Sequence, residues 1–582
     1  MRSLLTMASR LLLFGCLLGS QAFAQTVPPA ATPGGAQPKL DFEITEPFVY
    51  PNTEVVPEAE KPLPAEEAGA PRMMVRGFRI RGVIEREALG ITQPKIEALV
   101  VAESQKLLQA AGAPGFTLSM FETLTRSIAA YYRERGYFLA RAYIPEQKVP
   151  DGIVTIAIVE GFLDQVVYKG NQRYSEAQLQ ELFGPLVGEP VYLPDVERAI
   201  FIANEFPGLR ATALFGPGLK AGSAAIQVSS EETPSAGFFS LDNYGSFYTG
   251  EQRLRANYQV NNFFGQADRL STNLILTLDP QNSTYMDFAY EQPVLDYDYV
   301  AGGGYSLNSF DVGGNLADLG INGESSIING YMSYIYRRQR SERMSATLDL
   351  SLKSAQSKIL STLDSQDKLT VLSLSGLYQG TSWSDSGAYQ QLGVTLSLGL
   401  EGILGAMDSN GDGLSGRTGG SGNRASGGFS KINIDYLRLQ KLAELQSLIF
   451  RASLQNSSDL LASMEQFSLG GPDSVRAYPV AEALVDNAWL LSVEWRAQAS
   501  PDIPQTLLHN LQLFVFLDYA KGSLNDPLNN EINSVTFSGY GFGADVEPYR
   551  QFKARVQFAF DLGDPPSDSQ SLPFYFSLRY DF

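Results

Sequence analysis

The sequence predicts a transmembrane antiparallel β-barrel of about 16 strands, preceded by two small α+β domains. Three observations carry this prediction: an export signal at the start of the chain, alternating apolar and polar positions through residues 236–582, and an aromatic carboxyl terminus at Phe582. In an exported chain, strands of alternating polarity fit a barrel that has lipid on one face and a lumen on the other.

The first 24 residues have the features of a secretory signal peptide. Arg2 and Arg10 make this segment basic, Leu11–Leu18 is a short apolar core, and Ala22–Ala24 provides the small residues of a cleavage site. The only cysteine of the chain, Cys16, lies inside the segment. The cleaved protein therefore has no thiol with which to form a disulfide.

Composition and charge exclude several classes of protein. The 582 residues carry a formal net charge of −19, which becomes −21 when the two arginines of the signal peptide are removed. An acidic chain without a basic cluster argues against nucleic acid as a partner. After residue 25 no apolar run is long enough for a transmembrane helix, so strands are expected to cross the membrane.

Residues 25–72 differ in composition from everything that follows. They contain ten prolines, which exclude a long helix or a central strand. We expect this segment to be a linker with at most one short ordered piece, around Leu40–Tyr50.

Residues 73–161 and 162–232 are expected to form two small domains with the same order of elements, strand–helix–helix–strand–strand. Each offers an open sheet edge to which an unfolded polypeptide can add as a further strand. The alternative is that both domains are spacers. The predicted elements are 75–83, 92–110, 118–135, 139–144 and 153–159 in the first domain, and 163–169, 175–183, 194–206, 210–215 and 224–229 in the second.

The barrel prediction covers residues 236–582. Residues 270–278 alternate between a predicted lipid face and a predicted lumen face. The lipid face has Leu270, Thr272, Leu274, Leu276 and Leu278, and the lumen face has Ser271, Asn273, Ile275 and Thr277. The last strand ends at Phe582, and we expect it to close the barrel against the first strand and to signal membrane insertion. The strand candidates start near 236, 251, 269, 283, 297, 325, 343, 369, 387, 427, 446, 487, 509, 535, 551 and 572.

One loop of the predicted barrel contains an unusual charge. Gly470–Tyr478 lies between two strand-like runs and carries Arg476 in a Gly/Pro-rich context without an acidic cluster beside it. If the loop folds into the barrel, Arg476 needs a buried anion, because an unpaired buried charge costs several kcal/mol. Asp518 falls on the inward face of the run Leu511–Ala520 and is the candidate partner. The alternative is that Arg476 is an ordinary exposed loop residue.

The usual catalytic and metal-binding patterns are poorly represented. His509 is the only histidine, so a catalytic triad or a multi-histidine metal site would have to depend on it. Asp408–Gly413 resembles the first half of a calcium-binding loop, but Gly419 occupies the position of the bidentate glutamate. We therefore expect no enzyme activity, no metal and no cofactor.

Several motifs resemble one known family, the two-partner secretion transporters (TpsB, hemolysin-activator type) of the outer-membrane assembly superfamily. The similarity covers residues 73–582. Gly136–Pro145 and Asp151–Gly161 look like parts of the first polypeptide-transport-associated (POTRA) domain of that family. Ser474–Tyr478 resembles its VRGY loop signature, and Phe516–Ala520 resembles its F-x-D-x-G strand motif.

The resemblance implies a role for these residues. In such proteins the arginine and aspartate form a salt bridge that holds the sixth extracellular loop in the lumen. Ala477 and Ala520 stand where the family usually has glycine, which is tolerable unless a positive φ is required. The implied loop residues are Gly470, Gly471, Val475, Arg476, Ala477 and Tyr478, and the implied strand partners are Phe516, Asp518 and Ala520.

The resemblance also implies the function, the partners and the location. It points to a Gram-negative outer-membrane translocase whose periplasmic POTRA domains capture an unfolded partner exoprotein. The barrel then conducts the exoprotein to the surface, and barrel assembly machinery and lipid are further partners. The alternatives are a factor that inserts other barrels, a barrel-borne hydrolase and a passive pore. The family often has an N-terminal plug helix, which the prolines of 25–72 make doubtful here.

Overall fold

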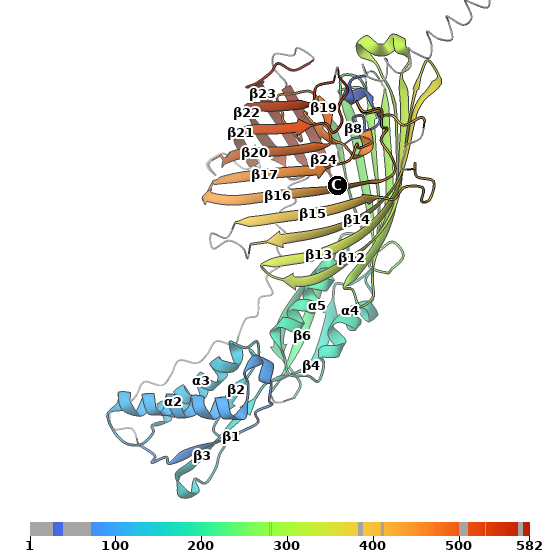
Figure 1. The fold of residues 1–582 in the computed structure, drawn as a ribbon. Helices are drawn as coiled ribbons and strands as arrows, with labels where there is room; N and C mark the ends of the chain where they lie inside the picture. Colours follow the sequence, from blue (N-terminus) through green and yellow to red (C-terminus); the bar gives the residue numbers. More distant parts are fainter. Residues whose placement is uncertain are drawn as a thin grey trace, which may run out of the picture. The chain divides into compact units, whose positions relative to one another are not determined.

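The computed structural model describes residues 27–38, 71–220, 222–278, 280, 282–381, 388–408, 413–499, 510–529, 531–567 and 574–582. The predicted signal peptide, most of the predicted linker, His509 and the segment 409–412 lie outside these residues. The chain divides into two compact units, residues 50–233 and residues 1–49 together with 234–582 (Figure 1). Within the described residues, no helix combines the length and the apolarity needed to span a membrane.

The first domain of the 50–233 unit is a three-stranded sheet packed against two helices. In its sheet, β3 lies between β1, to which it is parallel, and β2, to which it is antiparallel. Ile96 on α2, and Leu124 and Ile128, which lie one helical turn apart on α3, are fully buried in the core. The elements are β1 (Gly77–Arg81), η2 (Glu87–Leu89), α2 (Gln93–Ala111), α3 (Leu118–Arg133), β2 (Arg141–Tyr143), η3 (Pro150–Gly152) and β3 (Ile153–Val159).

The second domain of this unit repeats the order. Strand β6 is central, parallel to β4 and antiparallel to β5, which leaves β4 and β5 as the sheet edges. Ser175 and Gln178 form a reciprocal capping box at the start of α4. The elements are β4 (Phe162–Lys169), α4 (Glu176–Phe183), η4 (Gly184–Leu186), α5 (Leu193–Glu205), β5 (Leu209–Pro217) and β6 (Ser223–Glu232).

The two domains of the unit meet at a packed junction. The backbone N–H of Leu193 donates to the carbonyl of Gly136 at 2.9 Å. Gly136 has a φ of +93°, and a Cβ there would lie 2.6 Å from the Tyr192 ring, so both the backbone and the contact require glycine. The rings of Tyr137 and Tyr192 then pack with their centroids 5.1 Å apart.

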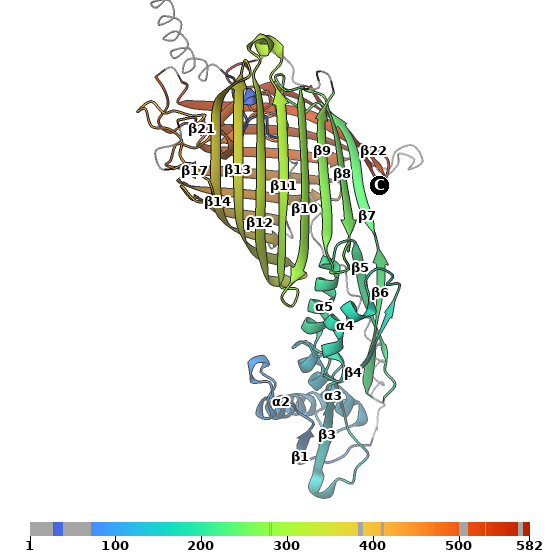
Figure 2. The same ribbon diagram turned by 90° about the vertical axis from the view of Figure 1, so that its right-hand side faces the viewer.

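The other unit is a closed antiparallel barrel of 16 strands (Figure 2). Each strand pairs with the next along the chain, except that β17 pairs with β20 and β24 closes on β7. The strands are β7 (Ser235–Asp242), β8 (Arg253–Asn261), β9 (Arg269–Thr277), β10 (Ser283–Val294), β11 (Tyr299–Asp311), β12 (Asn322–Gln339), β13 (Glu342–Ile359), β14 (Thr362–Gly380), β15 (Tyr389–Gly399), β16 (Phe429–Ala443), β17 (Gln446–Ser457), β20 (Asn487–Gln498), β21 (Asn510–Ser523), β22 (Ser534–Tyr549), β23 (Phe552–Asp561) and β24 (Phe574–Asp581).

The predicted strand starts fall within three residues of the observed ones in all cases except β14. That strand starts at Thr362, not near 369, because β13 and β14 continue as a long hairpin beyond the predicted alternating run. Residues 362–368 are mostly polar, as expected for a hairpin longer than the 9–11 residues that cross a bilayer. Polar residues on both faces remove the alternation on which the prediction depended.

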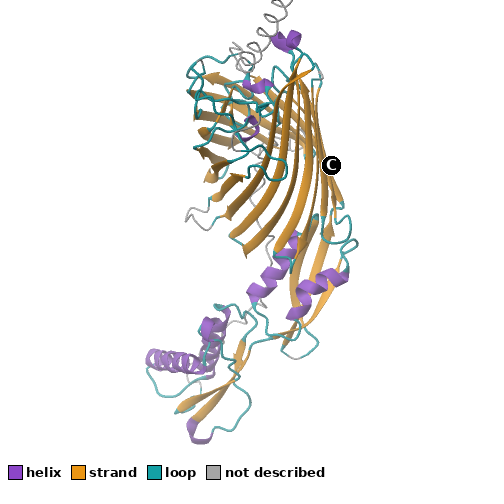
Figure 3. Cartoon of the chain, turned by 45° about the vertical axis from the view of Figure 1, so that its right-hand side comes forward, coloured by secondary structure: helices purple, strands orange, loops and turns teal. Residues whose placement is uncertain are grey.

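The alternation of the strands separates an outer face from a lumen. On β21, Val515 and Leu517 are 49% and 52% exposed on the outside, while Phe516 and Asp518 are buried. In Figure 3 the barrel wall consists of strand, and the few helical turns of this unit lie in the connections and the N-terminal segment. We call the end at which β7 starts the near end and the opposite one the far end.

The described part of the predicted linker packs into the barrel. Residues 27–38 contain a short 3-10 turn, η1 (Pro29–Ala31), instead of acting only as a connection. Ala31 and Ala36 are buried against Phe310, Val312 and Ile321, which come from β11 and the following connection at the far end. Proline-rich composition correctly excluded a long helix in this stretch but gave no signal that it packs.

Candidate functional site

The connection between β17 and β20 forms its own hairpin. Short strands β18 (Phe467–Leu469) and β19 (Ala483–Val485) pair with each other and leave residues 470–482 as its tip. Gly470 and Gly471 both have positive φ values, 97° and 92°. A Cβ on Gly470 would lie 2.1 Å from the carbonyl oxygen of Pro479, so the tip requires glycine there. We call residues 458–486 the lumen loop.

Arg476, at the tip of the lumen loop, meets Asp518 inside the barrel. Its Nε and Nη2 each donate to one carboxylate oxygen of Asp518 at 2.8 Å, and its backbone N–H donates to the same carboxylate at 3.2 Å. Ser492 Oγ also donates to this carboxylate, at 2.8 Å. Arg476 is 5% exposed and Asp518 is fully buried, so the two charges depend on each other for solvation.

A second carboxylate, which the sequence analysis did not identify, completes the arginine site. Arg476 Nη1 donates to Glu494 at 2.6 Å, and Arg496 donates to the other oxygen of Glu494 at 2.7 Å. Arg496 and Arg555 both pair with Asp545. Glu494 alternates with Val493 and Trp495 on β20, so the strand pattern already placed it toward the lumen. The pattern alone could not show which loop residue it would meet.

A row of glycines on β22 makes room for the site. A Cβ on Gly541 would lie 2.3 Å from the Phe516 ring, and one on Gly543 would lie 2.4 Å from the Phe514 ring. Because these glycines have no side chains, the Phe516 ring can lie close against β22. The Arg476 guanidinium lies over this ring, 3.3 Å from its centroid.

The remaining predicted loop residues pack around the arginine. Val475, Ala477 and Tyr478 are all fully buried, in one cluster with Ala520. Ala477 fits against Gly539, where an added Cβ would be only 2.5 Å away. Among the described residues with positive φ, neither Ala477 nor Ala520 appears, so alanine is accommodated at both positions without backbone strain.

Tyr478 fixes the tip to the last strands. Its ring stacks on Phe537 with centroids 4.3 Å apart, and its hydroxyl donates to the carbonyl of Asp564 at 2.8 Å. The hydroxyl of Tyr575, on β24, donates in turn to the carbonyl of Tyr478 at 3.2 Å. The tip is therefore bonded to β20, β21, β24 and the connection before β24.

Three further ion pairs, formed by two carboxylates, hold the base of the lumen loop, and the sequence analysis missed all of them. Glu465, which is 1% exposed, accepts from Lys353 on β13 at 2.7 Å and pairs with Lys431 on β16 at 2.9 Å. Asp486 is fully buried and accepts from Arg417, at 2.8 Å from its Nη2. These partners lie up to 112 residues apart in sequence, and no local pattern brings them together.

The family of the chain follows from its sequence together with this fold. Residues 222–546 match the haemolysin secretion/activation proteins ShlB/FhaC/HecB, and residues 90–161 match the ShlB-type POTRA domain. The chain belongs to this family. It is an outer-membrane transporter of two-partner secretion, and its POTRA domains lie in the periplasm. A secreted partner exoprotein is implied by the family.

Known relatives of this transporter have similar lengths and folds. HuxB of Haemophilus influenzae, a heme/hemopexin transporter protein, is 23% identical over 475 residues, which are 79% of this chain and 81% of HuxB. The outer membrane transporter CdiB of Dickeya dadantii is 30% identical over 153 residues, 26% of this chain and 27% of CdiB. The structure of CdiB from Escherichia coli covers 90% of this chain and 93% of its own, with a TM-score of 0.68 and 18% identity. That likeness shows a shared fold.

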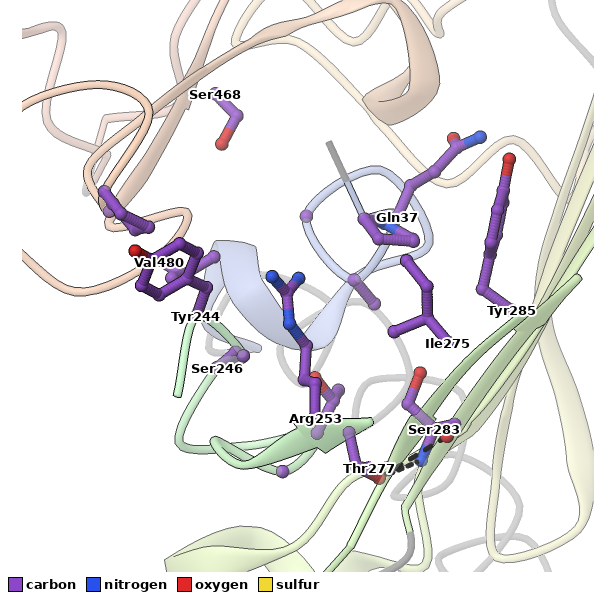
Figure 4. Close-up of a pocket in the computed structure, with 18 of the residues that line it drawn as sticks. Gln37, Tyr244, Ser246, Arg253, Ile275, Thr277, Ser283, Tyr285, Ser468 and Val480 are labelled. Carbon is purple, nitrogen blue, oxygen red and sulfur yellow. Dashed lines mark hydrogen bonds between the residues drawn. The ribbon is translucent and has the colours of Figure 1, made fainter. Parts of the chain in front are cut away.

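In this transporter the N-terminal residues 27–38 lie beside the tip of the lumen loop. The side-chain amide of Asn308 donates to the carbonyl of Ala36 at 3.2 Å, and a Cβ on Gly34 would lie 2.1 Å from the carbonyl oxygen of Ser463. Gln37, Tyr244, Arg253 and Ser468 surround a cavity of about 60 Å³ between these segments (Figure 4). The N-terminal segment, the lumen loop and the first far-end connection therefore occupy one region of the barrel.

The transporter's C-terminal residue closes the barrel wall. Phe582 and Gly237, on β7, exchange two backbone hydrogen bonds of 2.9 and 3.0 Å. The Phe582 ring stacks on Phe239 at 5.2 Å, over the position where Gly237 lacks a side chain. The described residues contain no cluster of three metal-ligating side chains.

Proposed function

We propose that the two POTRA domains hold the unfolded partner exoprotein in the periplasm by strand addition, and that the barrel conducts it to the cell surface. The observation that carries this proposal is strand β5, a nine-residue sheet edge. An extended polypeptide binds such an edge through backbone hydrogen bonds, which do not depend on its sequence.

The β5 edge is covered at one point and continues beyond it. Asn204 bonds both backbone groups of Ala211, donating to its carbonyl at 2.9 Å and accepting from its N–H at 3.0 Å. Because outward-pointing backbone groups recur at every second residue of an edge strand, the next ones belong to Ala213 and Phe215. Ala213 is only 2% exposed, whereas Phe215 is partly exposed. We assign exoprotein addition to β5 from Phe215 onward.

We assign to Arg476 and Asp518 the task of holding the lumen loop in its export-competent position. The buried ion pair and the packing of Val475, Ala477 and Tyr478 support this role, because they fix a loop of 29 residues (458–486) to the inner wall. Residues 27–38 act as a removable stopper beside it. The packing of Ala31 and Ala36 against β11 and its following connection supports this second role.

Transport of this kind needs no catalysis by the chain, and the sequence offers a single histidine, His509, to support any. Folding of the exoprotein outside the cell supplies direction. Lipid contacts the outward leucines of the strands, and barrel assembly machinery inserts the chain with Phe582 as its recognition residue. The pairing of Phe582 with Gly237 supports the latter assignment.

An outer-membrane assembly factor is the second candidate function, since such factors resemble this chain in barrel and loop. Assembly factors more often carry three or more POTRA domains, whereas this chain has two, which favours secretion. A barrel-borne hydrolase or a passive pore has no supporting observation among the described residues.

Deleting the transporter and comparing secreted proteins tests the proposal and separates the two candidates. A secretion translocase predicts that one large polypeptide disappears from the medium and accumulates or is degraded in the periplasm, while other barrels stay at normal levels. A general loss of outer-membrane barrels, with the secreted polypeptides unchanged, would instead identify an assembly factor.

A further inference from the structure

The lumen of the barrel has two unlike walls. We call the lumen-facing side chains of β20–β24, β7 and β8 the charged wall, because they include the Arg496–Asp545–Arg555 and Arg253–Asp242 ion pairs. On β12–β15 the lumen-facing positions at mid-strand carry hydroxyl groups. We call this set the neutral wall; its members are Ser333, Thr347, Ser373, Ser375, Thr395 and Ser397.

The register confirms which way these hydroxyls face. Leu348, Leu374 and Leu396 alternate with them and are 52%, 52% and 49% exposed on the outer face. The opposite face of the same strands must therefore point into the barrel. Charged side chains also lie on the lumen face of these strands: Asp349 accepts a hydrogen bond from Asn329 at 3.0 Å, Lys353 pairs with Glu465 at 2.7 Å, and Asp367 accepts from the backbone N–H of Gly416 at 3.0 Å.

The hydroxyls of the neutral wall bond to one another across neighbouring strands. The oxygen atoms of Ser333 and Thr347 are 2.7 Å apart, those of Ser375 and Thr395 are 2.9 Å apart, and Ser373 and Ser397 form a third pair at 3.0 Å. Such mutual pairing satisfies the hydroxyl groups, so that they offer a passing chain only neutral partners. A surface of this kind makes weak contacts that do not depend on sequence.

The two walls also differ in what covers them. On the charged wall the lumen loop buries Ser492, Glu494 and Asp518 to 8% exposure or less. On the neutral wall Ser375 and Thr395 remain half-buried. While the Arg476 site is intact, the charged wall is therefore occupied by the chain itself.

We propose that the transported polypeptide moves along the neutral wall, as an extended unfolded chain whose contacts with the row of hydroxyl groups are uncharged. This inference rests on the proposed secretion function and adds the path. On the charged wall an unfolded chain would meet fixed charges in a region of reduced dielectric, where opposite charges on the passing chain would be retained.

Single cysteines test the path without knowledge of the exoprotein. The only native cysteine, Cys16, lies in the predicted signal peptide, so the cleaved chain offers a clean background. The probe is maleimide-terminated poly(ethylene glycol), an uncharged flexible polymer, added to the full-length transporter in membranes. Ser375→Cys and Thr395→Cys report on the neutral wall. Gln557→Cys, 2% exposed on β23, is the matched position on the charged wall.

We expect polymer labelling at Ser375→Cys and Thr395→Cys and at least tenfold less at Gln557→Cys. All three should label equally after denaturation, which controls for reactivity. Labelling confined to Gln557→Cys, or absent from both neutral-wall variants, overturns the inference.

A second measurement separates this inference from the proposed function. The polypeptide lost on transporter deletion is given single cysteines and stalled during export, and disulfides to the three transporter variants are counted. Disulfides at the neutral wall support the path. Disulfides only at Gln557→Cys overturn the path while leaving secretion established. If deletion of the transporter removes no polypeptide from the medium, the proposed function is wrong, regardless of which cysteines the polymer labels.

Discussion

Arg476 satisfies its charge entirely with groups from other strands. Its guanidinium donates to Asp518, Glu494 and Ser492 while it lies over the Phe516 ring. A cation buried in this way stabilises the loop only if its partners are present, because desolvation offsets most of the attraction. Such a residue fixes where the loop lies more than it adds net stability.

The Arg476 site predicts an asymmetric mutant cycle. Arg476→Ala leaves two buried carboxylates without this partner, so we expect it to cost the upper part of the ~3–5 kcal/mol range for a broken buried pair. Asp518→Ala leaves Arg476 bonded to Glu494 and should cost less. The double variant should export no less than Arg476→Ala alone. The measurement is secreted exoprotein per inserted transporter in all four backgrounds, and simply additive defects would mean that the pair is not coupled.

The glycine row on β22 gives a second prediction. Gly541→Ala places a Cβ 2.0 Å from the carbonyl oxygen of Phe558 on β23 and 2.3 Å from the Phe516 ring, so the strand must adjust locally and the ring and the guanidinium above it must shift. We expect the lumen loop to become cleavable by added protease while the barrel stays folded. Gly376→Ala on β14 is the matched control, since nothing lies within 4 Å of its added Cβ. Equal protection of the loop in both variants would contradict this account.

At the scale of residues the sequence identified one anion of the site and missed the others. Strand alternation placed Asp518 inward, and the charge on Arg476 then required an anion. The alternation also placed Glu494 inward, but nothing in the sequence singled it out as a partner of Arg476. Lys353 and Lys431 reach Glu465 only because the barrel brings β13 and β16 together around the loop, and a single sequence carries no record of that approach.

Among the elements, the pairing of β24 with β7 depends on Phe582, the residue that follows β24. Strand β24 pairs with β7 over only five residues, and Phe582 adds two backbone bonds and a stacked ring beyond that ladder. Deleting Phe582 should therefore lower the yield of barrel that migrates differently before and after heating. Phe582→Tyr keeps the ring and the backbone and should stay near the wild-type yield. A normal yield of folded barrel from the deletion variant would show that Phe582 is not needed to close the barrel.

The N-terminal segment gives a prediction for an element that composition did not reveal. Residues 27–38 pack on β11 and contact the lumen loop through Gly34 and Ser463. Deleting 27–38 should raise the ion conductance of the inserted barrel and the sensitivity of cells to large antibiotics. The control is Gly216→Ala, a substitution in β5 with no neighbour within 4 Å. Unchanged conductance would show that the segment does not block the lumen.

Helices and strands were predictable where their apolar positions followed a single spacing along the whole element. Period-two alternation located the barrel strands because lipid and lumen impose it, and helical spacing located α2 and α3. Period-two alternation failed for residues 362–368, where both faces of the strand are mostly polar. It also failed for β18 and β19, which lie inside the barrel within a loop. Proline content indicated where helices were excluded, but the packing of 27–38 depends on a surface that exists only in the closed barrel.

At the scale of the whole molecule, capture in the periplasm must be coupled to passage through the barrel. A polypeptide held by strand addition stays extended, because backbone pairing prevents it from collapsing. An extended chain is also the form that can share the lumen with the tethered loop. The edge of β5 and the neutral wall are thus expected to handle the same conformation of the same chain.

Phe215 on β5 allows this coupling to be tested. Its backbone N–H points away from β6, in the same direction as that of Ala211, which Asn204 occupies, and Phe215 is partly exposed. Phe215→Pro removes this outward donor without removing a bond of the β5–β6 ladder, as proline is tolerated on sheet edges. We expect export to fall at least tenfold, with exoprotein retained in the periplasm and normal amounts of inserted barrel.

Phe215→Leu is the matched control, because it also loses the ring contact with Phe138 but keeps the N–H. If leucine exports normally and proline does not, the lost donor is responsible and β5 is the edge that receives the exoprotein. If both variants are equally impaired, loss of the contact with Phe138 is the cause. If both export normally, strand addition at this edge is wrong, and the exoprotein must reach the barrel by way of another surface of the POTRA domains.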